Sequence, residues 1–122
     1  MELKNKINLG QFSLCINVKD IKTSLEFYQK LDFEKTGGDI TDGWVILQNG
    51  NLELGLFQGH FKESHLLNFR KEDVYKIDKE LKSRGILMKS DAEKESDGSV
   101  GATLEDPDGN LIYFNTHPDE IE

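Results

Sequence analysis

The chain has 122 residues, enough for one domain with an ordinary core. Its formal net charge is −8, from 23 acidic and 15 basic side chains, and this disfavours nucleic acid, because a polyanion needs a clustered positive surface. The single cysteine excludes an internal disulfide, and no segment approaches the roughly 20 apolar residues of a membrane-spanning helix. Residues 1–6 lack the apolar core of a signal peptide, so we expect a cytoplasmic protein with no nucleic-acid or membrane partner.

The first half of the chain begins with a predicted strand and helix. Apolar residues alternate with polar ones from Phe12 to Val18, which is typical of a strand with one face on the core. Asp20 occupies a helix N-cap position, and an apolar stripe through Leu25 follows it. Glycines at 37, 38 and 43 indicate loops, and Asn49-Gly50 predicts a hairpin between strands at 44–48 and 52–57.

The second half repeats this order. Asp73 is a predicted N-cap, and Gly85 has the position of a left-handed helix end. We expect a short strand at 86–89, a mobile polar loop at 90–98, and strands at 100–104 and 111–115 around the turn 106–109. A repeat of about 50 to 60 residues that occurs twice indicates a duplicated supersecondary unit, because a solenoid needs three or more copies.

Two βαβββ units, the helix segments Glu26-Phe27-Tyr28 and Leu31-Asp32-Phe33, and the closing run 106–112 together resemble the vicinal oxygen chelate superfamily. This superfamily includes glyoxalase I, bleomycin-resistance proteins and extradiol dioxygenases. The resemblance spans residues 9–117. It implies a single α+β domain over 1–122, in which units at about 9–58 and 63–117 form a curled mixed sheet around a cavity. It also implies a homodimer, since members of this length commonly complete their cavities across a two-fold interface.

The resemblance also locates four positions that hold metal ligands in the family's metalloenzymes, one on the first and one on the last strand of each unit. They fall on Ser13, Glu53, Ser64 and Tyr113, so only Glu53 keeps a ligand. Serine hydroxyls are poor neutral ligands, and a tyrosine would have to lose a proton whose ordinary pKa is about 10. We therefore expect no metal and no other cofactor.

An alternative site remains open. A one-residue bulge would turn His65 toward the cavity, where His60 and Glu53 would complete a carboxylate and two-imidazole set suited to zinc or nickel. The protein would then be a metal-dependent lyase or isomerase of glyoxalase type. A further alternative is a dimer-forming accessory module whose cavity is filled by its own side chains.

The hypothesis that we favour is a domain that binds a small organic molecule in the cavity without metal. We expect one face of the strand to pack against a helix through Leu52, Leu54 and Leu56. Because side chains alternate along a strand, Glu53, Gly55 and Phe57 should then lie on the pocket face. A carboxylate there needs a ligand, a water or a hydroxyl such as that of Ser13 as its partner. If the protein is an enzyme, Glu53 is its catalytic base. The expected ligand-binding residues are Ser13, Cys15, Trp44, Phe57, Ser64 and Tyr113. For the aromatic residues among them, the alternative is a purely structural role.

Overall fold

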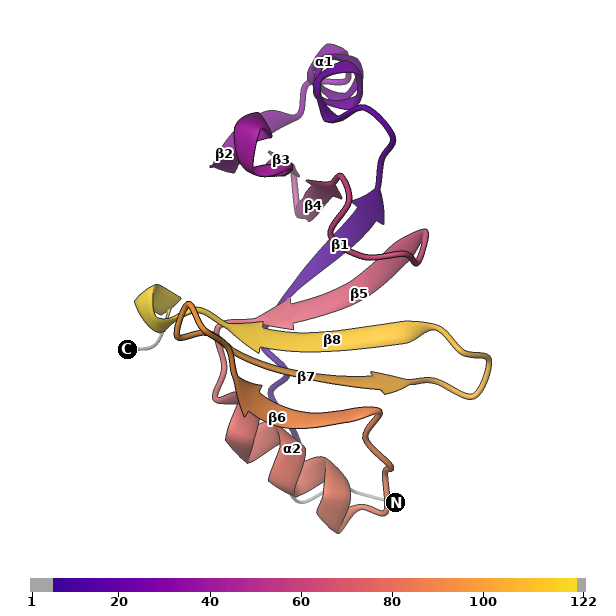
Figure 1. The fold of residues 1–122 in the computed structure, drawn as a ribbon, viewed down its shortest axis with the longest axis vertical. Helices are drawn as coiled ribbons and strands as arrows, with labels where there is room; N and C mark the ends of the chain where they lie inside the picture. The colour runs from indigo at the N-terminus through magenta and orange to yellow at the C-terminus, as the bar shows by residue number, and fades with distance from the viewer. Residues whose placement is uncertain (1–5, 121–122) are drawn as a thin grey trace. The chain divides into compact units, whose positions relative to one another are not determined.

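The computed structural model describes residues 6–120. Each half of the chain has the order βαβββ, and this confirms the predicted mixed α+β fold (Figure 1). The elements are β1 (Gln11–Asn17), α1 (Ile21–Lys30), β2 (Glu34–Asp39), η1 (Ile40–Asp42), β3 (Trp44–Asn49), β4 (Leu52–Phe57), β5 (His65–Arg70), α2 (Val74–Ser83), β6 (Ser90–Lys94), β7 (Val100–Glu105), β8 (Leu111–Thr116) and η2 (Pro118–Glu120). The chain divides into an N-terminal unit, residues 13–67, and a C-terminal unit, residues 68–120 together with 6–12.

The N-terminal unit is a mixed sheet covered on one face by α1 (Figure 1). Its strand order is β2-β3-β4-β1, with β1 parallel to β4 and the other neighbours antiparallel. Asp20 caps α1 as predicted, because its carboxylate accepts the Thr23 N–H at 3.2 Å. The core between sheet and helix consists of Ile21, Val45, Leu47, Leu54 and Leu56, with Leu14, Ile16, Val18, Leu25, Tyr28 and Phe33 packed around them.

The C-terminal unit repeats this design with α2, which lies against β6 and β7. Its strand order is β5-β8-β7-β6. Asp73 caps α2 by accepting the Lys76 N–H at 3.3 Å, and Gly85 adopts the predicted left-handed conformation at φ 81°. The core consists of Val74, Ile77, Leu81, Met88, Ala102, Leu104 and Phe114.

Three local predictions are wrong. Residues 86–89 form no strand, and part of the expected loop at 90–98 is the strand β6. This strand pairs with β7 through Ser90↔Thr103, Glu93↔Gly101 and Lys94↔Val100, with a shift of register between Ser90 and Glu93. Most of its side chains are exposed, so its sequence lacks the apolar alternation that identifies a half-buried strand. The glycines at 37 and 38 likewise lie within β2, which also contains a register shift.

Asp78 links α2 to β6 from a buried position. Its carboxylate accepts the Ala92 N–H at 2.5 Å and lies 2.9 Å from Lys82 Nζ, which also contacts Asp91 at 3.0 Å. Burial alone would raise the pKa of Asp78, but the hydrogen bonds from Ala92 and Lys82 outweigh it and hold the pKa below its ordinary value. The hydrogen bonds of Lys82, first with Asp78 and then with Asp91, raise the pKa of Lys82. Within residues 6–120, no helix is long and apolar enough to cross a membrane.

Candidate functional site

The candidate site begins on the face of the N-terminal sheet that α1 does not cover. Leu54 and Leu56 pack toward α1, as predicted from the alternation in β4. Glu53, Gly55 and Phe57 therefore occupy the opposite face, here called the open face. The parallel register Leu14↔Leu54 and Cys15↔Gly55 places the alternate residues of β1, Ser13 and Cys15, on the same face.

Ser13 and Glu53 form a buried pair on this face. The Ser13 hydroxyl donates a hydrogen bond to Glu53 Oε2, and the two residues are 1% and 4% exposed. The register brings them together, since each immediately precedes a residue of the aligned pair Leu14 and Leu54. The expected need of this carboxylate for a partner is therefore met in part by the hydroxyl.

Gly55 lies beside this pair and is closely covered. A Cβ at this position would come within 2.7 Å of Phe57 Cε1 and 3.2 Å of the Cys15 Sγ. The Phe57 ring therefore lies over Gly55, and Cys15 is buried beside it. The middle of the open face is apolar.

The far end of the open face is aromatic. Trp44 pairs with Phe57 across the β3–β4 hairpin, and their rings are nearly parallel, at 12° with centroids 6.2 Å apart. The His60 and Phe57 rings are nearly perpendicular, with centroids 5.6 Å apart, and the centroid of the Phe61 ring lies 5.7 Å from that of Phe57. Trp44, Phe57 and Phe61 are half-buried, so each presents part of its surface.

The alternative metal set does not assemble. His60 Nε2 lies 3.0 Å from the Asp42 carbonyl oxygen, and His65 Nδ1 lies 3.0 Å from the Ser64 hydroxyl. His60 contacts Phe57, which is four residues from Glu53 along β4, a separation of about 13 Å. In the described part of the chain, no three His, Cys, Asp or Glu side chains are grouped so that they could hold a metal ion. The residues present thus do not fit the family's metal.

Ser64 lies apart from the Ser13–Glu53 pair. It precedes β5, its side chain is exposed, and its carbonyl oxygen accepts the Asn17 N–H at 3.0 Å, at the end of β1 that is remote from Ser13. Tyr113 belongs to the C-terminal unit, where it is half-buried on β8. Its hydroxyl would lie 2.8 Å from a Cβ at Gly101, so its ring covers a strand glycine much as Phe57 covers Gly55.

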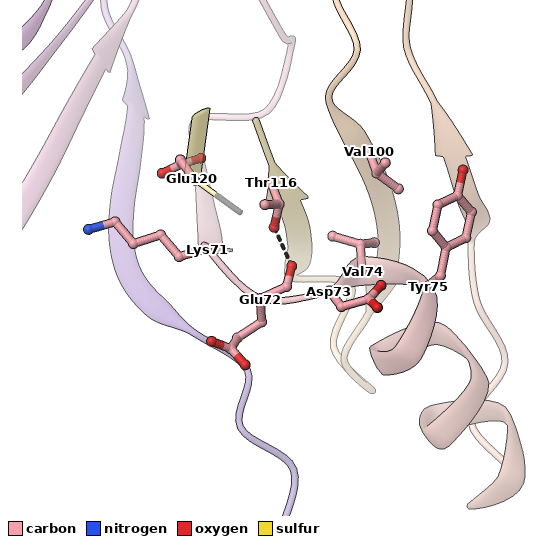
Figure 2. Close-up of a pocket in the computed structure, with 8 residues that line it drawn as sticks. All are labelled: Lys71, Glu72, Asp73, Val74, Tyr75, Val100, Thr116 and Glu120. Carbon is pink, nitrogen blue, oxygen red and sulfur yellow. Dashed lines mark hydrogen bonds between the residues drawn. The ribbon is translucent and has the colours of Figure 1, made fainter. Parts of the chain in front are cut away.

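A separate depression in the C-terminal unit was not predicted. It has a volume of about 730 Å³ and lies at the start of α2 (Figure 2). Several of its polar groups are already engaged: Thr116 donates to the Glu72 carbonyl, Asp73 caps α2, and Glu120 pairs with Arg70. These contacts favour a structural role. The lining residues are Lys71, Glu72, Asp73, Val74, Tyr75, Val100, Thr116 and Glu120.

Comparison with known proteins identifies relatives of this fold. The family model of the Glyoxalase/Bleomycin resistance protein/Dioxygenase superfamily matches residues 9–114. None of the curated proteins matches the chain.

Three solved structures are similar over most of their length. A protein from Legionella pneumophila described as an NAD-dependent benzaldehyde dehydrogenase gives a TM-score of 0.73 at 19% identity, covering 87% of this chain and 98% of that one. A superfamily member from Vibrio splendidus 12B01 gives 0.62 at 15% identity, covering 86% and 97%. A hypothetical protein from Bacillus halodurans C-125 gives 0.61 at 20% identity, covering 85% and 91%. At such identities the likeness shows the fold alone.

Proposed function

Since the chain belongs to the Glyoxalase/Bleomycin resistance protein/Dioxygenase superfamily, we propose that it binds a small organic molecule on the open face of its N-terminal unit, without a metal ion. The observation that carries this proposal is the buried carboxylate of Glu53 on a sheet face whose other residues, Cys15, Gly55 and Phe57, are apolar. A pocket with mostly apolar walls and a few placed polar groups is the usual composition of a small-molecule site.

The chemistry of this face favours a ligand with a hydrogen-bond donor at one end and an apolar body. Ser13 donates one hydrogen bond to Glu53, and since a carboxylate offers two acceptor oxygens, a cationic donor on the ligand would make a charge-assisted hydrogen bond to the same group. The apolar body would lie along Cys15 and Gly55 toward Trp44 and Phe57. Glu53 thus fixes the orientation of the ligand, and the aromatic end supplies contact area.

The preference for charge can be tested with three probes of matched shape: benzylamine, benzyl alcohol and benzoate. We expect benzylamine to raise the thermal unfolding temperature of the parent protein most and benzoate least. The variant Glu53→Gln keeps the shape of the side chain and removes its charge, so it should fold normally and lose the preference for benzylamine. An equal response of parent and variant to all three probes would refute the site.

We further propose that the protein is a homodimer in a reducing compartment such as the cytoplasm, with no nucleic-acid or membrane partner. The support is the family's usual assembly, the free buried Cys15 and the net charge of −8. Sedimentation at micromolar concentration should give twice the mass of the chain, and the mass of a monomer would contradict the dimer.

A further inference from the structure

The His60 imidazole joins the ends of the two strands that carry the aromatic pair of the open face. From this contact we infer that His60 is a positioning residue, which fixes the Trp44 and Phe57 rings for the apolar part of the ligand. The inference rests on the proposed function, in which that part of the ligand lies toward these two rings. It assigns a role to a histidine that lies away from Glu53 and belongs to no metal set.

The polar contact of His60 is with the turn that precedes β3. Its Nε2 lies 3.0 Å from the Asp42 carbonyl oxygen, and because a carbonyl oxygen only accepts hydrogen bonds, Nε2 carries a proton and is the donor. The next residue, Gly43, has a φ of 80°, and a Cβ there would come within 3.1 Å of His60 Nε2. The imidazole therefore lies close against the main chain immediately before Trp44.

The apolar contact of His60 is with the last residue of β4. The His60 and Phe57 rings are nearly perpendicular, at 78°, an arrangement that favours one relative orientation of two rings. Phe57 is half-buried, so its neighbours decide which rotamer it adopts, and it pairs with Trp44 across the hairpin. His60 thus ties the chain before Trp44 to the ring of Phe57, and each of its two contacts fixes one member of the aromatic pair.

The main chain around His60 is held by contacts that do not involve the imidazole. The Gln58 N–H donates to the Gly43 carbonyl oxygen at 2.8 Å, and Asn17 Nδ2 donates to the Phe61 carbonyl oxygen at 2.6 Å. Removal of the imidazole should therefore leave the loop in place and change the setting of the two rings. This separates a positioning role from a contribution to the fold.

The position of His60 predicts which part of a ligand depends on it. The Phe57 ring lies over Gly55, which follows Glu53 on the open face, so a ligand held by Glu53 can bring an aromatic group to this ring. The ammonium group of that ligand would contact Glu53, which His60 does not contact. His60 should thus affect the affinity for the ring of the ligand and not that for its ammonium group.

NMR titrations with benzylamine and methylammonium test this division. His60→Ala should weaken benzylamine binding about two- to tenfold, the range of one aromatic contact, and leave methylammonium binding unchanged. His60→Gln can still donate to the Asp42 carbonyl and should recover part of the loss. His117→Ala is the matched control, because His117 contacts Asp119 in the other unit, and it should bind both amines as the parent does. An equal loss of both amines in His60→Ala, or a loss of neither, would overturn the inference.

Near-UV circular dichroism of the ligand-free protein gives a readout that does not require any ligand. Trp44 is the only tryptophan in the sequence, so its band reports on its stacking with Phe57. His60→Ala should reduce this band at an unchanged far-UV spectrum, and His117→Ala should leave both spectra as in the parent. The two possible failures are distinguishable: a parent protein that binds neither amine refutes the proposed function, whereas an unchanged tryptophan band in His60→Ala refutes the role of His60.

Discussion

The Ser13 hydroxyl donates a hydrogen bond to the buried carboxylate of Glu53, from the strand that runs parallel to β4. In the metalloenzymes that the sequence resembles, these two positions hold metal ligands. Here a hydroxyl and a carboxylate bond to each other instead. This pair explains how the Glu53 carboxylate is held in an apolar setting.

Removal of the hydroxyl should therefore destabilise the fold. Ser13→Ala leaves the buried carboxylate without this donor, and we expect a loss of about 1–3 kcal/mol in the free energy of unfolding. Ser64→Ala is a suitable control, because the Ser64 side chain is exposed, and it should change stability by less than about 0.5 kcal/mol. Urea denaturation of both variants measures the difference, and equal losses would contradict the importance of the buried pair.

Gly55 should not tolerate a side chain. In Gly55→Ala the new methyl group would collide with the Phe57 ring, and we expect a loss of about 1–3 kcal/mol from overpacking. Gly37→Ala tests the same change in a strand where the nearest atom to the new Cβ is 3.8 Å away, so it should be nearly neutral. Thermal unfolding compares the two. A neutral Gly55→Ala would mean that the ring does not rest on this glycine.

Asp78 should make stability depend on acid. Its pKa in the folded protein is held below the ordinary value of 3.8, so its contribution is present above that value and is lost as the pH falls through the folded pKa. We expect Asp78→Asn to cost about 1–2 kcal/mol at neutral pH, and the gap to the parent to close in acid.

The control for this prediction uses the other carboxylate that Lys82 contacts. Asp91 is 71% exposed at its side chain, so Asp91→Asn should have little effect at any pH. The free energies of unfolding of the parent and Asp78→Asn should be compared over a series of pH values. A difference between them that stays constant into the acid range would contradict the role assigned to Asp78.

Purified and dialysed protein should hold no stoichiometric zinc or nickel. The reason is that Ser13 is bonded to Glu53, while His60 and His65 contact other groups away from it. Elemental analysis should find far less than one metal ion per chain. One ion per chain, lost on His65→Ala, would show that the site assembles after all.

The fold could be predicted largely from local patterns. Alternation from Phe12 to Val18, and the caps at Asp20 and Asp73, are signals that a sequence carries by itself. The strand β6 was missed because a strand that pairs on one side with β7 and exposes most of its side chains has no apolar period to detect. Its position is fixed by partners that are distant in sequence.

The candidate site could be predicted in part for a similar reason. The alternation of side chains along β4, together with the resemblance, placed Glu53 and Ser13 on one face of the sheet. In the structure the two side chains are joined by a hydrogen bond. The distance between Glu53 and the histidines depends on where the loop after β4 returns, and the sequence does not encode this in a local pattern.

The most direct test of the proposed function is a crystal structure of the metal-stripped protein grown with benzylamine. The account predicts difference density on the open face, with the ammonium group at hydrogen-bond distance from the Glu53 carboxylate and the ring toward Phe57. Density confined to the depression at the start of α2, or a Glu53 side chain that points into solvent with no ligand beside it, would contradict the account.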